Sequence, residues 1–140
     1  MMHAAAILAR SGLVPASAGA ACLSDTSLPA EFGRSDAVFT GTVIAHRPLP
    51  PQDHYFDRDG DVYVVNVNEV FRGKPGASVQ IFSENSSGRF PMEIGANYIL
   101  FVSRKHERML VDRCDNSGGL PTGEPTVAAV RALISRKRNR

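Results

Sequence analysis

The sequence predicts a mainly β protein, namely a five-stranded closed barrel of the OB type (the oligonucleotide- and oligosaccharide-binding fold) followed by a C-terminal helix. Three observations support this fold class. Five short runs rich in β-branched and aromatic residues follow one another, with turn residues between them. No helical segment alternates with these runs, which argues against a βαβ protein. A glycine interrupts the first run, as expected of a strand that bends round a small barrel. An open antiparallel sheet with one helix is the competing architecture.

The first expected strand is Asp36–Ala45, ending near His46, and it organises the rest of the chain. In an extended chain successive side chains point to opposite faces. Gly41 contributes no side chain to the packing, so we expect a bend or a close backbone approach there. One face would carry Ala37, Phe39, Gly41, Val43 and Ala45, and the other Val38, Thr40, Thr42 and Ile44.

The remaining strands are expected where apolar runs resume between loops rich in proline, glycine and aspartate. The nearly continuous apolar run within Asn97–Ser103 predicts burial on both faces, under the C-terminal helix. The segment 22–34 is expected to be irregular. The expected strands after the first are Val62–Phe71, Ser78–Ser83, Asn97–Ser103 and Met109–Arg113.

A C-terminal helix is predicted from residue 125 onward. Pro125 suits the first turn of a helix, where its missing N–H is not needed. An apolar stripe at helical spacing then predicts that the helix docks on the barrel. The stripe consists of Val127, Val130, Leu133 and Ile134.

The 140 residues suit one domain, and the 43% apolar content is enough for a core that folds without an obligatory metal or other cofactor. We expect a signal peptide over residues 1–21, the domain over 22–135 and a basic tail over 136–140. The net charge is +2, and the surplus lies in that tail rather than in the basic stripe of a nucleic-acid-binding protein. The chain has no apolar run long enough to span a bilayer.

Export is expected from the first 21 residues, which are rich in alanine and lack acidic side chains. Two Ala-x-Ala sequences, at residues 16–18 and 18–20, suit a signal peptidase. The predicted location is therefore secreted or periplasmic. Arg10 interrupts the apolar stretch, so a short cytosolic tail is the alternative interpretation.

The chain has two cysteines, Cys22 and Cys114. In an oxidising compartment an even pair predicts a disulfide, while two unrelated buried thiols are expected if the chain stays in the cytosol. Neither cysteine has a second cysteine or a histidine at zinc-ligand spacing, so no zinc site is predicted.

An ordered set of short motifs resembles the netrin-like and tissue-inhibitor-of-metalloproteinases superfamily, in particular its small secreted bacterial members. After an early cysteine come Ser-Asp-Ala-Val-Phe-Thr-Gly-Thr-Val at 35–43, Val-Asn-Glu-Val-Phe-Arg-Gly at 67–73 and Gly-Ala-Asn-Tyr-Ile-Leu-Phe-Val at 95–102. A second cysteine and an alanine-rich helix follow. Ser24 and Ser87 stand where the family often has cysteines, so one bridge of the family is expected here and another is not.

The resemblance implies an OB-type barrel whose N-terminal segment is tied down by a Cys22–Cys114 disulfide. In the animal inhibitors the first cysteine is the mature N-terminus, and its amine and carbonyl chelate the catalytic zinc of a target protease. The matching edge here, Cys22, Leu23 and Ser24, is the expected partner-binding surface. Cleavage after Ala18 or Ala20 would leave at least one residue before Cys22 and remove its free amine.

Other chemistry has weaker support in the sequence. The acidic loop Asp53–Asp61 is a weak calcium candidate through Asp57, Asp59 and Asp61, but its glycine comes too early for a calcium loop of the EF-hand type, and a solvated turn is the alternative. The histidines are scattered, and no sequence motif of a hydrolase or phosphate loop is present. Basic residues alternate with aromatic residues in too few places for nucleic-acid binding.

The predicted function is therefore that of a secreted or periplasmic, non-enzymatic protein-binding module that resembles metalloproteinase inhibitors. Its partner would be a protein, with a zinc metalloprotease as the first candidate. The alternative is a non-inhibitory accessory or structural module of the envelope.

Overall fold

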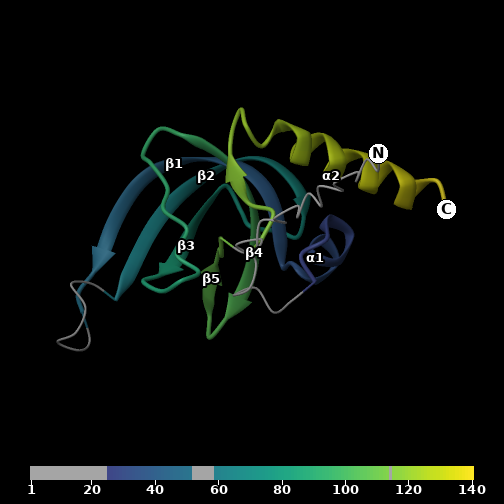
Figure 1. The fold of residues 1–140 in the computed structure, drawn as a ribbon. Coiled ribbons are helices and arrows are strands. Elements are labelled where there is room, and N and C mark those ends of the chain that lie inside the picture. Colours follow the sequence, from purple (N-terminus) through teal and green to yellow (C-terminus); the bar gives the residue numbers. More distant parts are fainter. Residues whose placement is uncertain (1–24, 52–58, 114) are drawn as a thin grey trace, which may run out of the picture.

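The computed structural model describes residues 25–51, 59–113 and 115–140. A short helix precedes the first strand, and a longer helix ends the chain (Figure 1). The helices and strands are α1 (Leu28–Arg34), β1 (Ala37–Leu49), β2 (Gly60–Arg72), β3 (Ser78–Glu84), β4 (Asn97–Lys105), β5 (Arg108–Leu110), β6 (Gly118–Gly119) and α2 (Glu124–Arg138).

Five of the strands pair in a ring. β1 is antiparallel to β2 on one edge and to β4 on the other. β3 is antiparallel to β2 and parallel to β5, and β5 is antiparallel to β4. The order is therefore β1-β2-β3-β5-β4 and back to β1, while β6 adds a sixth strand on β4. The mainly β prediction with a C-terminal helix is confirmed; within the described ranges the sheet has six strands, where five were expected.

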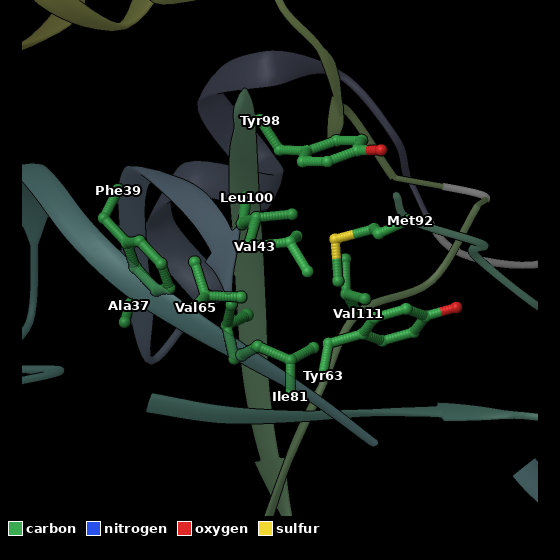
Figure 2. Close-up of a cluster of buried hydrophobic side chains, with 11 residues drawn as sticks. Ala37, Phe39, Val43, Tyr63, Val65, Ile81, Met92, Tyr98, Leu100 and Val111 are labelled. Carbon is green, nitrogen blue, oxygen red and sulfur yellow. The ribbon is translucent and has the colours of Figure 1, made fainter. Parts of the chain in front are cut away.

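The inward-facing side chains of the ring form one apolar cluster, which we call the inner cluster (Figure 2). Alternate residues of β1 contribute to it, as the sequence predicted, because Ala37, Phe39 and Val43 share one face of an extended strand. Met92 and Val111, from segments outside the strands, complete the cluster. Its members are Ala37, Phe39, Val43, Tyr63, Val65, Ile81, Met92, Tyr98, Leu100, Val102 and Val111.

A second cluster, the outer cluster, lies between the ring and the two helices. The predicted two-sided burial of β4 is confirmed, because Tyr98, Leu100 and Val102 belong to the inner cluster while Ile99 and Phe101 belong to the outer one. The predicted docking of α2 is confirmed too. The outer cluster consists of Phe32, Val38, Ile99, Phe101, Val127 and Val130, with Leu28, Phe71, Leu120, Leu133 and Ile134 packed against it.

The prediction of an irregular segment up to residue 34 was wrong, because α1 forms there. Pro29 stands at the start of the helix, where a fixed φ favours the first turn. Phe32 is buried in the outer cluster, and this tertiary contact stabilises a helix too short to persist alone.

The fifth strand is shorter than predicted, since β5 ends at Leu110 and not at Arg113. Loop contacts take the backbone groups that would have extended the pairing. The Arg113 N–H donates to the Gly88 carbonyl (3.1 Å), and the Asp112 N–H donates to Asp115 Oδ2 (3.3 Å). Neither helix in the described ranges is long and apolar enough to cross a membrane.

Candidate functional site

Most of the predicted site residues lie outside the described part of the chain. These are Cys22, Leu23, Ser24, Asp57 and Cys114. The disulfide and the Cys22 edge therefore stay predictions, as does the calcium loop, of which Asp59 and Asp61 alone are described.

Asp61, at the start of β2, is the most deeply buried carboxylate in the described residues, with no exposed surface. Its Oδ1 lies 2.8 Å from His46 Nε2, and its Oδ2 lies 3.5 Å from Arg89 Nε. The His46 ring stacks on Tyr63 with centroids 4.6 Å apart and planes 11° apart. Cationic or hydrogen-bonding nitrogens thus face both carboxylate oxygens, which is the arrangement that a buried charge requires.

Little in the sequence pointed to this cluster, because His46 is one of several scattered histidines. The two strands bring it together: His46 is near the end of β1, Asp61 is near the start of β2, and three register shifts along β1 set their pairing. Within the described residues, no three histidine, cysteine, aspartate or glutamate side chains are placed to hold a metal ion.

A second polar cluster fastens the N-terminal segment to the segment that follows β5. The buried Glu31 carboxylate accepts the Asn116 backbone N–H at 3.0 Å through Oε2, and Asn116 Nδ2 donates to the Thr26 carbonyl at 2.9 Å. Burial raises the pKa of Glu31, while the hydrogen bonds from Asn116 act in the opposite direction. We call this set, Thr26, Glu31 and Asn116, the N-terminal clip.

Asp115 lies next to the clip. Its Oδ1 accepts the Ser117 N–H at 2.7 Å, and its Oδ2 accepts the Asp112 N–H. Burial raises the pKa of Asp115 to about 7, and the nearby charge of Glu31 adds to the effect. Two carboxyl groups with raised pKa values therefore flank the loop that carries Asn116.

A groove of about 470 Å³ lies on the ring between β3 and the β4–β5 hairpin. Its rim carries three arginines from separate segments, Arg47 of β1, Arg104 of β4 and Arg108 of β5. We call it the arginine groove. The Arg108 guanidinium lies 4.4 Å from the centre of the Phe82 ring, which is a cation–π contact. Its floor is apolar, formed by Leu49, Val62, Phe82 and Met109.

The sequence did not predict the arginine groove. Its arginines are far apart along the chain, and only the pairing of the five ring strands brings them together. A scan against protein-family models gives no match, and neither does a search of curated proteins. Function is therefore inferred from the N-terminal clip and the arginine groove.

Proposed function

We propose that this chain is an exported, non-catalytic protein-binding module, an OB-type barrel of the netrin-like and metalloproteinase-inhibitor kind. The ring order β1-β2-β3-β5-β4, with its parallel β3–β5 pair, supports the barrel part of the proposal. The partner would be a protein, and a zinc metalloprotease is the first candidate.

The N-terminal clip is the observation that carries this proposal. Thr26 lies four residues after Cys22, and Asn116 lies two residues after Cys114. The hydrogen bond between Thr26 and Asn116 holds the two segments together. Cys22 lies within about 14 Å of Thr26 and Cys114 within about 7 Å of Asn116, the reach of four and two extended residues. A Cys22–Cys114 bridge is thus within reach, and it would hold the Cys22, Leu23 and Ser24 edge against the domain.

A tethered edge is suited to binding because little conformational entropy is lost when it docks. If the mature chain begins at Cys22, its neutral amine and its carbonyl form a five-membered chelate. That chelate can occupy the open coordination position on the zinc of a partner protease. An additional residue before Cys22 converts the amine into an amide, which is a poor ligand.

The test combines N-terminal sequencing of the exported protein with a panel of zinc proteases. A chain that begins at Cys22 should inhibit at least one protease, and a matched chain that keeps Ala21 should lose that inhibition. The proposal is contradicted if neither chain inhibits or forms a complex with any member of the panel.

A non-inhibitory accessory module of the envelope is the second candidate, and the arginine groove favours it. Three exposed guanidinium groups around an apolar floor form a surface that can bind a partner without any role for the N-terminus. In that case washed envelope fractions should release an Arg47→Gln/Arg104→Gln double variant at lower salt than the native chain. Equal retention of the two proteins would speak against this candidate.

A further inference from the structure

We propose that the arginine groove binds an extended acidic segment of a partner protein, which adds as a strand beside Ser78–Gln80 of β3. The described residues that line the groove lie between positions 47 and 109, and the inhibitor proposal assigns no role to any of them. A peptide site there therefore goes beyond the inhibitor proposal and supplies a partner chemistry for the groove. Three features of the groove support this proposal: an unpaired strand edge, the positive charge of the rim and the apolar floor.

One edge of β3 is partly unpaired because β5, the strand beside it, is short. β3 pairs with β2 along its whole length, from Ser78 to Glu84. On its other edge it pairs with β5 at Ile81 and Phe82. In the described part of the chain no strand pairs with that edge at Ser78–Gln80, and these residues line the groove. An unpaired edge is a template for a strand from another chain.

The rim of the groove is positively charged. Arg47, Arg104 and Arg108 are exposed, and none forms an ion pair with a carboxylate in the described residues. Of the described residues that line the groove, Glu107 alone is acidic. Arginine binds carboxylates through two parallel hydrogen bonds, so this rim is complementary to acidic side chains.

The apolar floor of the groove favours binding of an acidic peptide over binding of a nucleic acid or a sulfated glycan. Leu49, Val62 and Met109 offer apolar contacts, which suit a strand in which acidic and apolar side chains alternate. Single-stranded nucleic acid needs exposed aromatic platforms for its bases. Among the described residues that line the groove Phe82 is the one aromatic side chain, and it is 7% exposed beneath Arg108. A sulfated glycan would use the arginines and leave the apolar floor unused.

The experiment measures fluorescence anisotropy of a labelled peptide of about nine residues, the length of an ordinary strand, with glutamate and valine alternating. The full exported chain should bind it, and the affinity should fall when salt is raised from roughly 0.05 to 0.2 M. A peptide with lysine in place of glutamate should not bind. A glutamate–valine peptide methylated on alternate backbone nitrogens should bind at least about tenfold more weakly, because it cannot complete the strand pairing.

The protein variant is Arg47→Gln/Arg104→Gln, which leaves the contact of Arg108 with Phe82 in place. We expect about tenfold weaker binding, the effect of two exposed ion pairs. The matched control is Arg138→Gln/Arg140→Gln at the exposed end of the chain, which removes the same charge and should bind as the native chain does. Thermal melts of both variants show whether they fold.

The proposal is overturned if the folded groove variant binds the peptide as tightly as the control, or if the lysine peptide or the methylated peptide binds equally well. It is also overturned if the acidic peptide fails to bind, and binding of a heparin fragment or a single-stranded oligonucleotide in its place would assign the groove to that class. The Arg47→Gln/Arg104→Gln variant should inhibit proteases as the native chain does. A failure of peptide binding at the groove is therefore distinguishable from a failure of the inhibitor proposal.

Discussion

Gly41 shows how one residue sets the geometry of β1. A Cβ placed on it would lie 2.5 Å from Val65 Cγ1 and 2.7 Å from the Asn66 carbonyl oxygen, closer than non-bonded atoms can approach. The register of β1 against β2 shifts between Thr40 and Gly41. The close backbone approach predicted from the glycine is confirmed, and it allows the two strands to bend together.

We therefore expect Gly41→Ala to lower the free energy of unfolding by about 1–3 kcal/mol, the usual effect of inserting a methyl group where there is no space. Urea denaturation of the purified domain measures this change through the transition midpoint.

Gly33→Ala is the matched control for this substitution. Gly33 lies in α1, and nothing is within 4 Å of the position that its Cβ would take. Alanine loses less conformational entropy than glycine in a helix, so we expect a gain of up to about 1 kcal/mol. If both substitutions change stability by the same amount, the steric explanation for Gly41 is wrong.

Asp115 predicts a pH dependence of stability. Its pKa is about 7 in the folded chain and 3.8 when unperturbed, mainly because of burial. Between these values the folded chain holds a proton that the unfolded chain has released. The contribution of Asp115 to stability is therefore fully present below about pH 4, decreases as the pH rises to about 7, and is level above that.

Asp115→Asn should remove this decrease. The asparagine variant cannot ionise, so its stability relative to the native chain should increase from pH 4 to pH 7, whatever constant offset follows from the altered hydrogen bonds. Thermal melts at closely spaced pH values measure the difference. A difference that stays constant across this range would show that Asp115 does not titrate in this way.

Among the helices and strands, hydrophobic periodicity predicted correctly which faces are buried. The two-sided burial of β4 and the apolar stripe of α2 were both visible in the sequence, and both pack as predicted. α1 was missed because Pro29 and Gly33 read as loop residues, whereas burial of Phe32 against the ring stabilises the helix. Tertiary packing outweighed local propensity there.

The docking of α2 can be tested at Val130, which is completely buried in the outer cluster. Val130→Ala removes two methyl groups from a packed site and should cost about 2 kcal/mol of stability. Arg138→Ala, at the exposed end of the same helix, should change stability by less than about 0.5 kcal/mol. Equal effects in urea denaturation would mean that the helix does not depend on this contact.

At the scale of the whole molecule, the ring and its surfaces depend on pairings that no local pattern specifies. The parallel contact of β3 with β5 is two residue pairs long, and the β1–β4 pairing joins segments about 60 residues apart. The arginine groove and the His46–Asp61 pair exist only once these pairings form. For that reason the sequence predicted the mainly β fold with its C-terminal helix, whereas the groove became visible only in the structure.

The protein-binding proposal depends most on the fastening of the N-terminal segment beside the segment that contains Cys114. Peptide mapping without reduction, on protein collected outside the cytoplasm with free thiols blocked beforehand, measures this directly. We expect one linked pair of peptides that contain Cys22 and Cys114, and a loss of roughly 4 kcal/mol of stability when the bridge is reduced. Recovery of both cysteines with blocked thiols would contradict the account.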